Sequence, residues 1–319
     1  MAPSPFSAIL RSWKSNSVLK GGICKLKPYT DCAPCVLKWI YERLEAPLSE
    51  TERFTVLKRV MSVLSKDLEP SANLGALCNR CLETVEEFFP ATGAGYQAFK
   101  AKCNQVALEL LDQAREFIAK GETPRDRFER ACGIASVGNV APIGAPSAPF
   151  EFSHVEAIIK GKAPLPSPVG DVYQAALKAH HVFYVADNAG EIGFDSLLIS
   201  LLKELGLRVT LIVKEDPFFD DASPKDASFF GLGRLADAVL SVKAVFEPEH
   251  TPPEVADAFA KSDLVISKGT GNCEALWELP TNKNKIFMLK VKCGPMAMEM
   301  GAPIGTFMVK LENSPRSAE

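Results

Sequence analysis

The sequence contains no apolar run that approaches the roughly 18 residues needed to cross a bilayer. It also lacks an excess of positive charge, because 36 lysines and arginines face 39 acids and leave a formal net charge of -3. A chain without a basic field is poorly suited to nucleic acid. These absences exclude membrane-spanning and DNA-wrapping proteins. The 47% of apolar and 24% of charged residues are typical of a globular chain, and nothing in them specifies an oligomeric state.

The termini and the cysteines bear on where the protein works. Nine cysteines are an odd number in a chain too long to need disulfide bonds, which indicates a reducing compartment. Residues 1–22 contain three basic residues, several serines and no acid, a composition compatible with an organelle-targeting peptide. We favour a flexible leader over such a peptide and expect a cytoplasmic protein. Residues 313–319 are interpreted as a tail.

The first half of the chain has the periodicity of helices. Ser49 and Glu52 form a capping box ahead of an amphipathic run from Phe54 to Leu68. A second amphipathic run extends from Tyr96 to Ile118 and ends near Gly121. We therefore predict an all-helical domain over residues 23–165.

Two segments rich in proline and glycine, residues 138–149 and 162–170, interrupt this periodicity and favour a domain boundary. Beyond them, over residues 166–312, short apolar runs alternate with helical stretches. Such alternation predicts an α/β domain with a mostly parallel sheet covered on both faces. The expected strands are Val182–Ala186, Val209–Val213, Val239–Val242, Leu264–Ile266, Ile286–Leu289 and Phe307–Val309.

Polar residues follow several of these strands directly, at the edge where open α/β sheets bind ligands. Carboxylate and amide oxygens are ligands for hard divalent ions, and lysines hold phosphate oxygens. Each group alone is also common in helix caps and solvated loops. Together they indicate a site for a metal ion and a phosphate. The groups are Asp187, Asn188 and Glu191; Asp216, Asp220 and Asp221; Lys268, Asn272 and Glu274; and Lys290 and Lys292.

Four segments resemble the damage-control phosphatase family, once a domain of unknown function, which includes proteins first described as acidic-residue methyltransferases. They are DNAGEIGFD (Asp187–Asp195), VKEDPFFDDASPKDA (Val213–Ala227), SKGTGNCEAL (Ser267–Leu276) and LKVKC (Leu289–Cys293). Cys32-Ala33-Pro34-Cys35 and the step Gly138-Asn139 resemble its cysteine-bearing, prokaryotic-type branch. The similarity extends from about Asp31 to Leu311.

This resemblance implies a Rossmann-like three-layer α/β/α domain after a helical region. It also implies a phosphatase that requires Mn²⁺, Ni²⁺, Co²⁺ or Mg²⁺ and acts on small phosphorylated metabolites, either sugar phosphates or damaged relatives of normal intermediates. Asp187, Asn188 and Asp221 would be the metal ligands, with Glu191 a candidate to orient the attacking water. Asp195, Lys268, Asn272, Glu274 and Lys290 would surround the substrate and its phosphate.

The chain departs from the family pattern at two places. Pro142 stands where the family usually has an acid, which puts the role of that loop in doubt. Asp220-Asp221 stands where the family usually has Asn-Asp. The ligand carboxylate is kept, but the added charge beside it is expected to alter the metal preference.

The cysteine pairs Cys32/Cys35 and Cys78/Cys81 leave two interpretations open. Such thiols can bind structural zinc or an iron–sulfur cluster, or they can be buried or redox-active thiols on helix faces. Two alternatives to a phosphatase also stand. One is a carboxyl methyltransferase using S-adenosylmethionine, although no glycine-rich G-x-G loop follows the first strand. The other is a non-enzymatic metal or redox sensor that uses the cysteine pairs.

Overall fold

The computed structural model describes residues 28–44, 48–88 and 94–313. The leader interpreted at residues 1–22 lies outside these ranges, as does the tail beyond residue 313. Among the helices in these ranges, none combines the length and apolar character of a membrane span.

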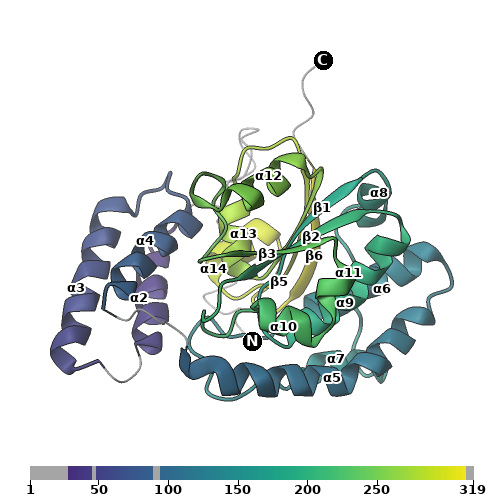
Figure 1. Cartoon of the computed structure of the whole chain (residues 1–319), viewed down its shortest axis with the longest axis horizontal. Coiled ribbons are helices and arrows are strands. Elements are labelled where there is room, and N and C mark those ends of the chain that lie inside the picture. Colours follow the sequence, from purple (N-terminus) through teal and green to yellow (C-terminus); the bar gives the residue numbers. More distant parts are fainter. Residues whose placement is uncertain (1–27, 45–47, 89–93, 314–319) are drawn as a thin grey trace, which may run out of the picture.

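A six-stranded sheet forms the centre of the molecule, in the order β3-β2-β1-β4-β5-β6 (Figure 1). Strands β1 to β5 run parallel and β6 is antiparallel to β5. The structure thus confirms the α/β class and the predicted strands, with bounds that differ by a few residues. The strands are β1 (His181–Val185), β2 (Arg208–Lys214), β3 (Ala238–Val242), β4 (Leu264–Lys268), β5 (Asn284–Lys290) and β6 (Phe307–Glu312).

Helices cover both faces of this sheet, because successive side chains of its apolar strands point to opposite sides. In β1, Val182 and Tyr184 pack into one core, and Phe183 and Val185 into another. The first core is covered by α5 (Gln97–Ala119), α6 (Pro124–Val137), α7 (Ser153–Ile159), α8 (Val172–Leu177), α9 (Glu191–Glu204), α10 (Pro224–Phe229) and α11 (Leu232–Leu235). The second is covered by α12 (Pro253–Lys261), α13 (Thr270–Leu276) and α14 (Gly294–Met300).

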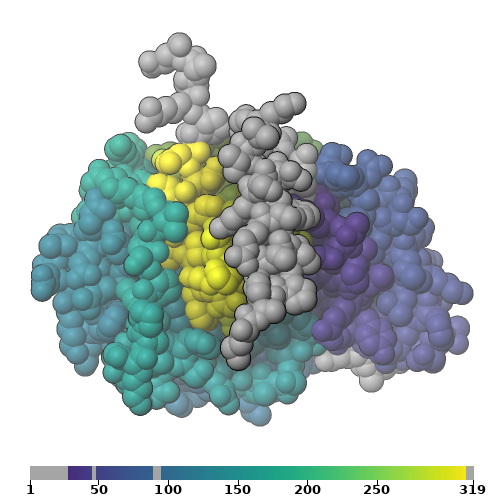
Figure 2. All heavy atoms as spheres, turned by 180° about the vertical axis from the view of Figure 1, so that it is seen from behind, coloured from purple at the N-terminus to yellow at the C-terminus, as the bar shows by residue number. Residues whose placement is uncertain are grey.

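Three earlier helices, α2 (Cys32–Arg43), α3 (Glu50–Asp67) and α4 (Leu74–Glu86), form a small core of their own. They occupy one end of the molecule, whereas α5 runs along the bottom in Figure 1 and α6 lies towards the opposite end (Figures 1 and 2). The predicted capping box of α3 is confirmed, since Ser49 N–H donates to Glu52 Oε2 at 2.7 Å. The described ranges also contain two short 3₁₀ turns, η1 (Ala94–Tyr96) and η2 (Pro248–His250).

The predicted boundary near residue 165 does not separate two packing units. Helices α5, α6 and α7 precede it, yet their apolar side chains share a core with β1, β2 and β4. Helices α2–α4 form a cluster of their own, and α4 packs on α13, where Asn73 Nδ2 donates to Ala275 O at 3.0 Å. The small helical group therefore lies against the sheet edge that carries the polar residues.

Candidate active site

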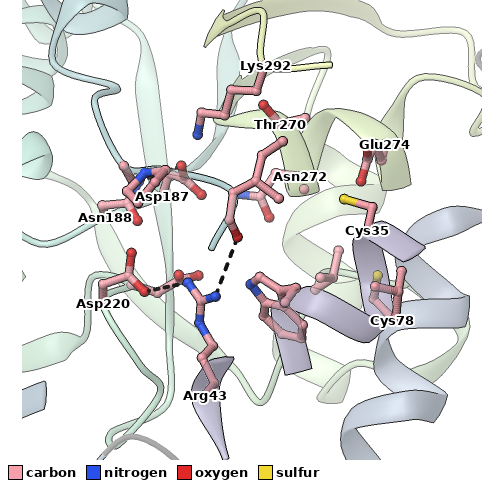
Figure 3. Close-up of a pocket in the computed structure, with 18 of the residues that line it drawn as sticks. Cys35, Arg43, Cys78, Asp187, Asn188, Asp220, Thr270, Asn272, Glu274 and Lys292 are labelled. Atoms are coloured by element: carbon pink, nitrogen blue, oxygen red, sulfur yellow. Dashed lines mark hydrogen bonds and ion pairs between the residues drawn. The ribbon is translucent and has the colours of Figure 1, made fainter. Parts of the chain in front are cut away.

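A cavity of about 180 Å³ opens where the carboxyl ends of β1, β2 and β4 meet the helices α2 and α4 (Figure 3). One wall comes from the loops after the strands and the other from the small helical group. The polar and aromatic lining consists of Cys35, Trp39, Arg43, Cys78, Asp187, Asn188, Lys214, Phe218, Asp220, Asp221, Thr270, Asn272, Glu274, Lys292 and Cys293.

The loops after β1 and β2 are tied together by their backbones. Asn188 and Asp221 form an antiparallel bridge. On either side of it, Ala189 N–H donates to Asp220 O at 2.9 Å, and Ala222 N–H donates to Asp187 O at 2.7 Å. Main-chain bonds thus place Asp187, Asn188 and Asp221 at one cavity, although Asp221 is far from the other two in the sequence.

Two amides orient the carboxylate of Asp187. Asn139 Nδ2 and Asn188 Nδ2 donate to Asp187 Oδ2 at 2.8 and 2.6 Å, and both also donate to Glu191 Oε2, at 2.9 and 3.0 Å. Each amide has thereby used both of its hydrogens. Within the described ranges, Asp187 Oδ1 and Asn188 Oδ1 accept no hydrogen bond. These two oxygens are available to a ligand in the cavity.

Asp187 and Asp221 lie in an environment that destabilises the charged forms of their side chains. Burial, and then the charge of Glu191, raises the pKa of Asp187 to about 6. Burial also raises the pKa of Asp221 well above its usual range; the charge of Lys214 opposes this shift, and those of Asp187 and Asp220 add to it. Carboxylates that repel one another in a desolvated site are stabilised by a bound cation.

The residues present fit a hard divalent ion. Two carboxylates and one amide supply oxygen donors of the kind that Mg²⁺ or Mn²⁺ prefers. No three His, Cys, Asp or Glu side chains of the described residues lie close enough to share a metal ion, so such a site depends on the amide of Asn188. Gly269, at φ +78°, keeps space for the carboxylate, because a Cβ there would lie 2.0 Å from Asp187 Oδ2.

A fully buried charge network lies behind these ligands. Lys268 Nζ donates to Glu191 Oε1 and to Asp195 Oδ1, both at 2.6 Å, and Tyr184 OH donates to Asp195 Oδ1 at 2.8 Å. Burial lowers the pKa of Lys268, but the charges of Asp195 and Glu191 outweigh it and raise that pKa. None of the four residues lines the cavity. The structure therefore places Lys268, Glu191 and Asp195 where they support the ligands from behind.

Replacing Lys268 by methionine should strongly destabilise the fold. The change leaves Glu191 and Asp195 as buried carboxylates without their cation, and breaking such a pair costs about 3–5 kcal/mol. Denaturant unfolding at neutral pH measures this loss. Lys160→Met is the matched control, because Lys160 pairs with Glu156 at the surface, and it should cost less than about 1 kcal/mol. Equal stability of the two variants would contradict the role given to the network.

Of the other residues predicted to surround the substrate, some line the cavity and others lie outside it. Asn272 and Glu274 line the cavity, and burial raises the pKa of Glu274 to about 7. Lys290 does not line it, because its Nζ lies over the ring of Phe307, 5.1 Å from the centroid. Lys292, two residues on, does line it.

Four residues at or beside the site carried no role in the sequence analysis. Lys214 ends β2, with its Nζ 3.2 Å from Asn272 Oδ1 and 3.9 Å from Asp221 Oδ2. Its position at the carboxyl end of a strand is a sequence feature that could have indicated a place at the site. Asn139 stands in the Gly138-Asn139 step, which was recognised without a function. Trp39 and Arg43 come from α2, and no local pattern indicates that this helix reaches the sheet.

The two interpretations of the paired cysteines stay open. Among the described residues, no three His, Cys, Asp or Glu side chains lie close enough to share an ion. Cys81 is buried in the core of α2–α4, whereas Cys35 and Cys78 line the cavity with Cys293. All cysteines in the described ranges are free thiols. Burial, and then the charge of Glu274, raises the pKa of Cys35 to about 11, so this thiol stays protonated at neutral pH.

Fold and site together define an α/β protein with an Asp–Asn–Asp oxygen cluster at the carboxyl edge of a parallel sheet. The chain belongs to the family of the damage-control phosphatase ARMT1-like domain, whose model matches residues 29–307. The resemblance found in the sequence is thereby confirmed.

Relatives from archaea match over nearly the whole chain. An uncharacterized protein of Methanocaldococcus jannaschii is 27% identical over 89% of this chain and 95% of its own. Proteins named damage-control phosphatase in Archaeoglobus fulgidus and Pyrococcus horikoshii are 26% and 27% identical, over 88% and 89% of this chain and 97% of their own. The crystal structure of a DUF89 family protein from Pyrococcus horikoshii shares the fold, with a TM-score of 0.70 at 23% identity, over 89% of this chain and 98% of that one.

Proposed function

We propose that this protein is a divalent-metal-dependent phosphomonoester hydrolase that acts on small phosphorylated metabolites, either sugar phosphates or damaged relatives of normal intermediates. Family membership supports a phosphatase. The observation that carries the proposal is the convergence of Asp187, Asn188 and Asp221 on one cavity, fixed by the backbone bridge between their loops.

Asp187, Asn188 and Asp221 would hold the ion, which we take to be Mn²⁺, Ni²⁺, Co²⁺ or Mg²⁺. A bound divalent ion supplies charge to polarise a phosphoryl oxygen and lowers the pKa of a water nucleophile. Asn139 supports this set from the side, since its amide fixes the Asp187 carboxylate while its Oδ1 accepts from Lys290 N–H at 3.3 Å.

The remaining cavity residues bind and orient the substrate. Lys214 and Lys292 place two cations at the cavity, where they stabilise the negative oxygens of a phosphoryl group. Because the pKa of Glu274 is about 7, its carboxyl can either accept a hydrogen bond from a substrate hydroxyl or donate one to it near neutral pH. Glu191 has both oxygens occupied by Lys268, Asn139 and Asn188. We therefore assign Glu191 to positioning the ligands rather than to orienting water.

The proposal is tested by assaying the full chain with p-nitrophenyl phosphate and a panel of phosphorylated metabolites. We expect hydrolysis with at least one of the four ions and its loss when EDTA is added. Absence of hydrolysis with every ion, or activity that EDTA leaves unchanged, would refute it. Titration with S-adenosylmethionine separates the methyltransferase alternative, which requires stoichiometric binding. One zinc or iron per chain without hydrolysis would instead favour the sensor.

Metal affinity should depend on pH in a defined direction. Since burial and Glu191 raise the pKa of Asp187 to about 6, protons compete with the ion below that pH and the carboxylate is free above it. The apparent affinity for Mn²⁺ should fall by about tenfold per pH unit for each displaced proton as the pH drops below about 6. Asp221, whose pKa burial also raises, adds to this fall. Titrations at several pH values measure this slope. An affinity that stays constant down to about pH 5 would contradict the assignment of Asp187.

A further inference from the structure

Arg43, the last residue of α2, brings a buried positive charge from the small helical group to the cavity (Figure 3). The residue is only 5% exposed. Its guanidinium lies over the rings of Trp39 and Phe219, 4.9 and 5.3 Å from their centroids. The two rings also meet each other edge to face, with centroids 5.5 Å apart, and their cation–π contacts hold the guanidinium at this place.

This guanidinium is paired with the acid next to a predicted metal ligand. Arg43 Nη2 donates to Asp220 Oδ1 at 3.1 Å, and both side chains are almost fully buried. Asp220 and Asp221 are adjacent, and Asp220 O also accepts the bond from Ala189 N–H that ties this loop to the Asp187 loop. The negative charge of Asp220 raises the pKa of the Asp221 carboxyl, and the positive charge of Arg43 lowers it.

Four acids line this cavity, namely Asp187, Asp220, Asp221 and Glu274, and Arg43 is paired with Asp220. An added negative charge strengthens the binding of a cation and weakens the binding of a phosphate dianion, because both interactions scale with charge over distance. The ion pair cancels that added charge without removing Asp220. The charge of Asp220 is therefore cancelled only when α2 holds Arg43 at the cavity.

We propose that Arg43 is a positioning residue of the metal site, whose ion pair with Asp220 sets how tightly the divalent ion is held. The inference rests on the proposed function. A purely structural role predicts that losing either partner loosens the Asp220–Asp221 loop and weakens metal binding. An electrostatic role predicts opposite effects, because one variant removes a positive charge and the other a negative one.

The test measures Mn²⁺ binding to the full chain for the wild type, Arg43→Met, Asp220→Asn and the double variant. We expect Asp220→Asn to raise the Kd about tenfold and Arg43→Met to lower it several-fold, with the double variant within about threefold of the wild type. Arg43→Lys keeps the charge and should stay near the wild type. Arg125→Met, which removes an exposed arginine paired with Asp171, is the matched control and should leave the Kd unchanged.

Weaker binding in both single variants, or a double variant as weak as Asp220→Asn, would overturn the inference. Circular dichroism checks folding. If Arg43→Met does not fold, the comparison of Asp220→Asn with the double variant still decides, since only charge cancellation restores the affinity. Variants that shift in the same direction in a chain that binds Mn²⁺ overturn this inference alone. A wild type that binds none of Mn²⁺, Ni²⁺, Co²⁺ and Mg²⁺ overturns the proposed function with it.

Discussion

Replacing Asp187 by asparagine should lower phosphatase activity by about a thousandfold or more. The variant removes one of the two carboxylates that would hold the ion, and a loss of about 4 kcal/mol of transition-state stabilisation corresponds to that factor. Its Oδ1 can still accept the bonds from Asn139 and Asn188, so the loop geometry is kept. Measuring kcat and KM for p-nitrophenyl phosphate with saturating Mn²⁺ gives the effect.

The fold of this variant should be intact. Burial raises the pKa of Asp187, so its charge costs folding free energy above that pKa, and a neutral amide removes the cost. In the absence of metal, we expect an unfolding free energy at neutral pH equal to or higher than that of the wild type. Asp257→Asn, on the exposed face of α12, is the control and should change neither activity nor stability. Wild-type turnover by Asp187→Asn would remove the basis of the site.

Gly269→Ala should lower kcat/KM by about a hundredfold, although the change adds only a methyl group. That methyl would stand 2.0 Å from Asp187 Oδ2 and force the carboxylate away from its amides. A displacement of about 1 Å at a catalytic group can cost this much. The backbone at φ +78° and ψ 166° adds strain for any residue with a Cβ. The Kd for Mn²⁺ should rise in parallel, which a simple loss of stability would not produce.

The matched control for this variant is Gly233→Ala. Gly233 lies in α11, does not have a positive φ, and has no atom within 4 Å of the position a Cβ would take. This variant should keep wild-type kcat/KM and metal affinity. If Gly269→Ala also kept wild-type kcat/KM and metal affinity, the close approach between Gly269 and Asp187 would not matter for function.

The sheet could be predicted from the sequence because its signal is local. Buried parallel strands are short, continuous apolar runs, and six such runs with helical stretches between them define the topology class. The packing of the helices could not be predicted in this way. Helices α5 and α6 have the same amphipathic pattern as α3, yet they cover the sheet while α3 packs on α2 and α4. Which apolar faces meet depends on contacts far apart in the sequence.

The residues of the candidate site show the same division. Asp187, Asn188 and Asp221 directly follow strands, and parallel strands bring their carboxyl ends to one edge, so their convergence was foreseeable. Lys268 and Lys290 also end strands, but Lys268 points into the buried layer and Lys290 onto Phe307. Side-chain direction at the last strand residue is set by the pleat and by neighbouring strands. Arg43 and Trp39 could not be assigned, because their contacts depend on how α2 docks.

The most direct test of the metal site is anomalous diffraction from crystals of the full chain grown with Mn²⁺. We predict one strong peak bounded by Asp187, Asn188 and Asp221, and its loss in Asp187→Asn. A peak located only among Cys35, Cys78 and Cys293, or none at a Mn²⁺ concentration that supports hydrolysis, would contradict the account.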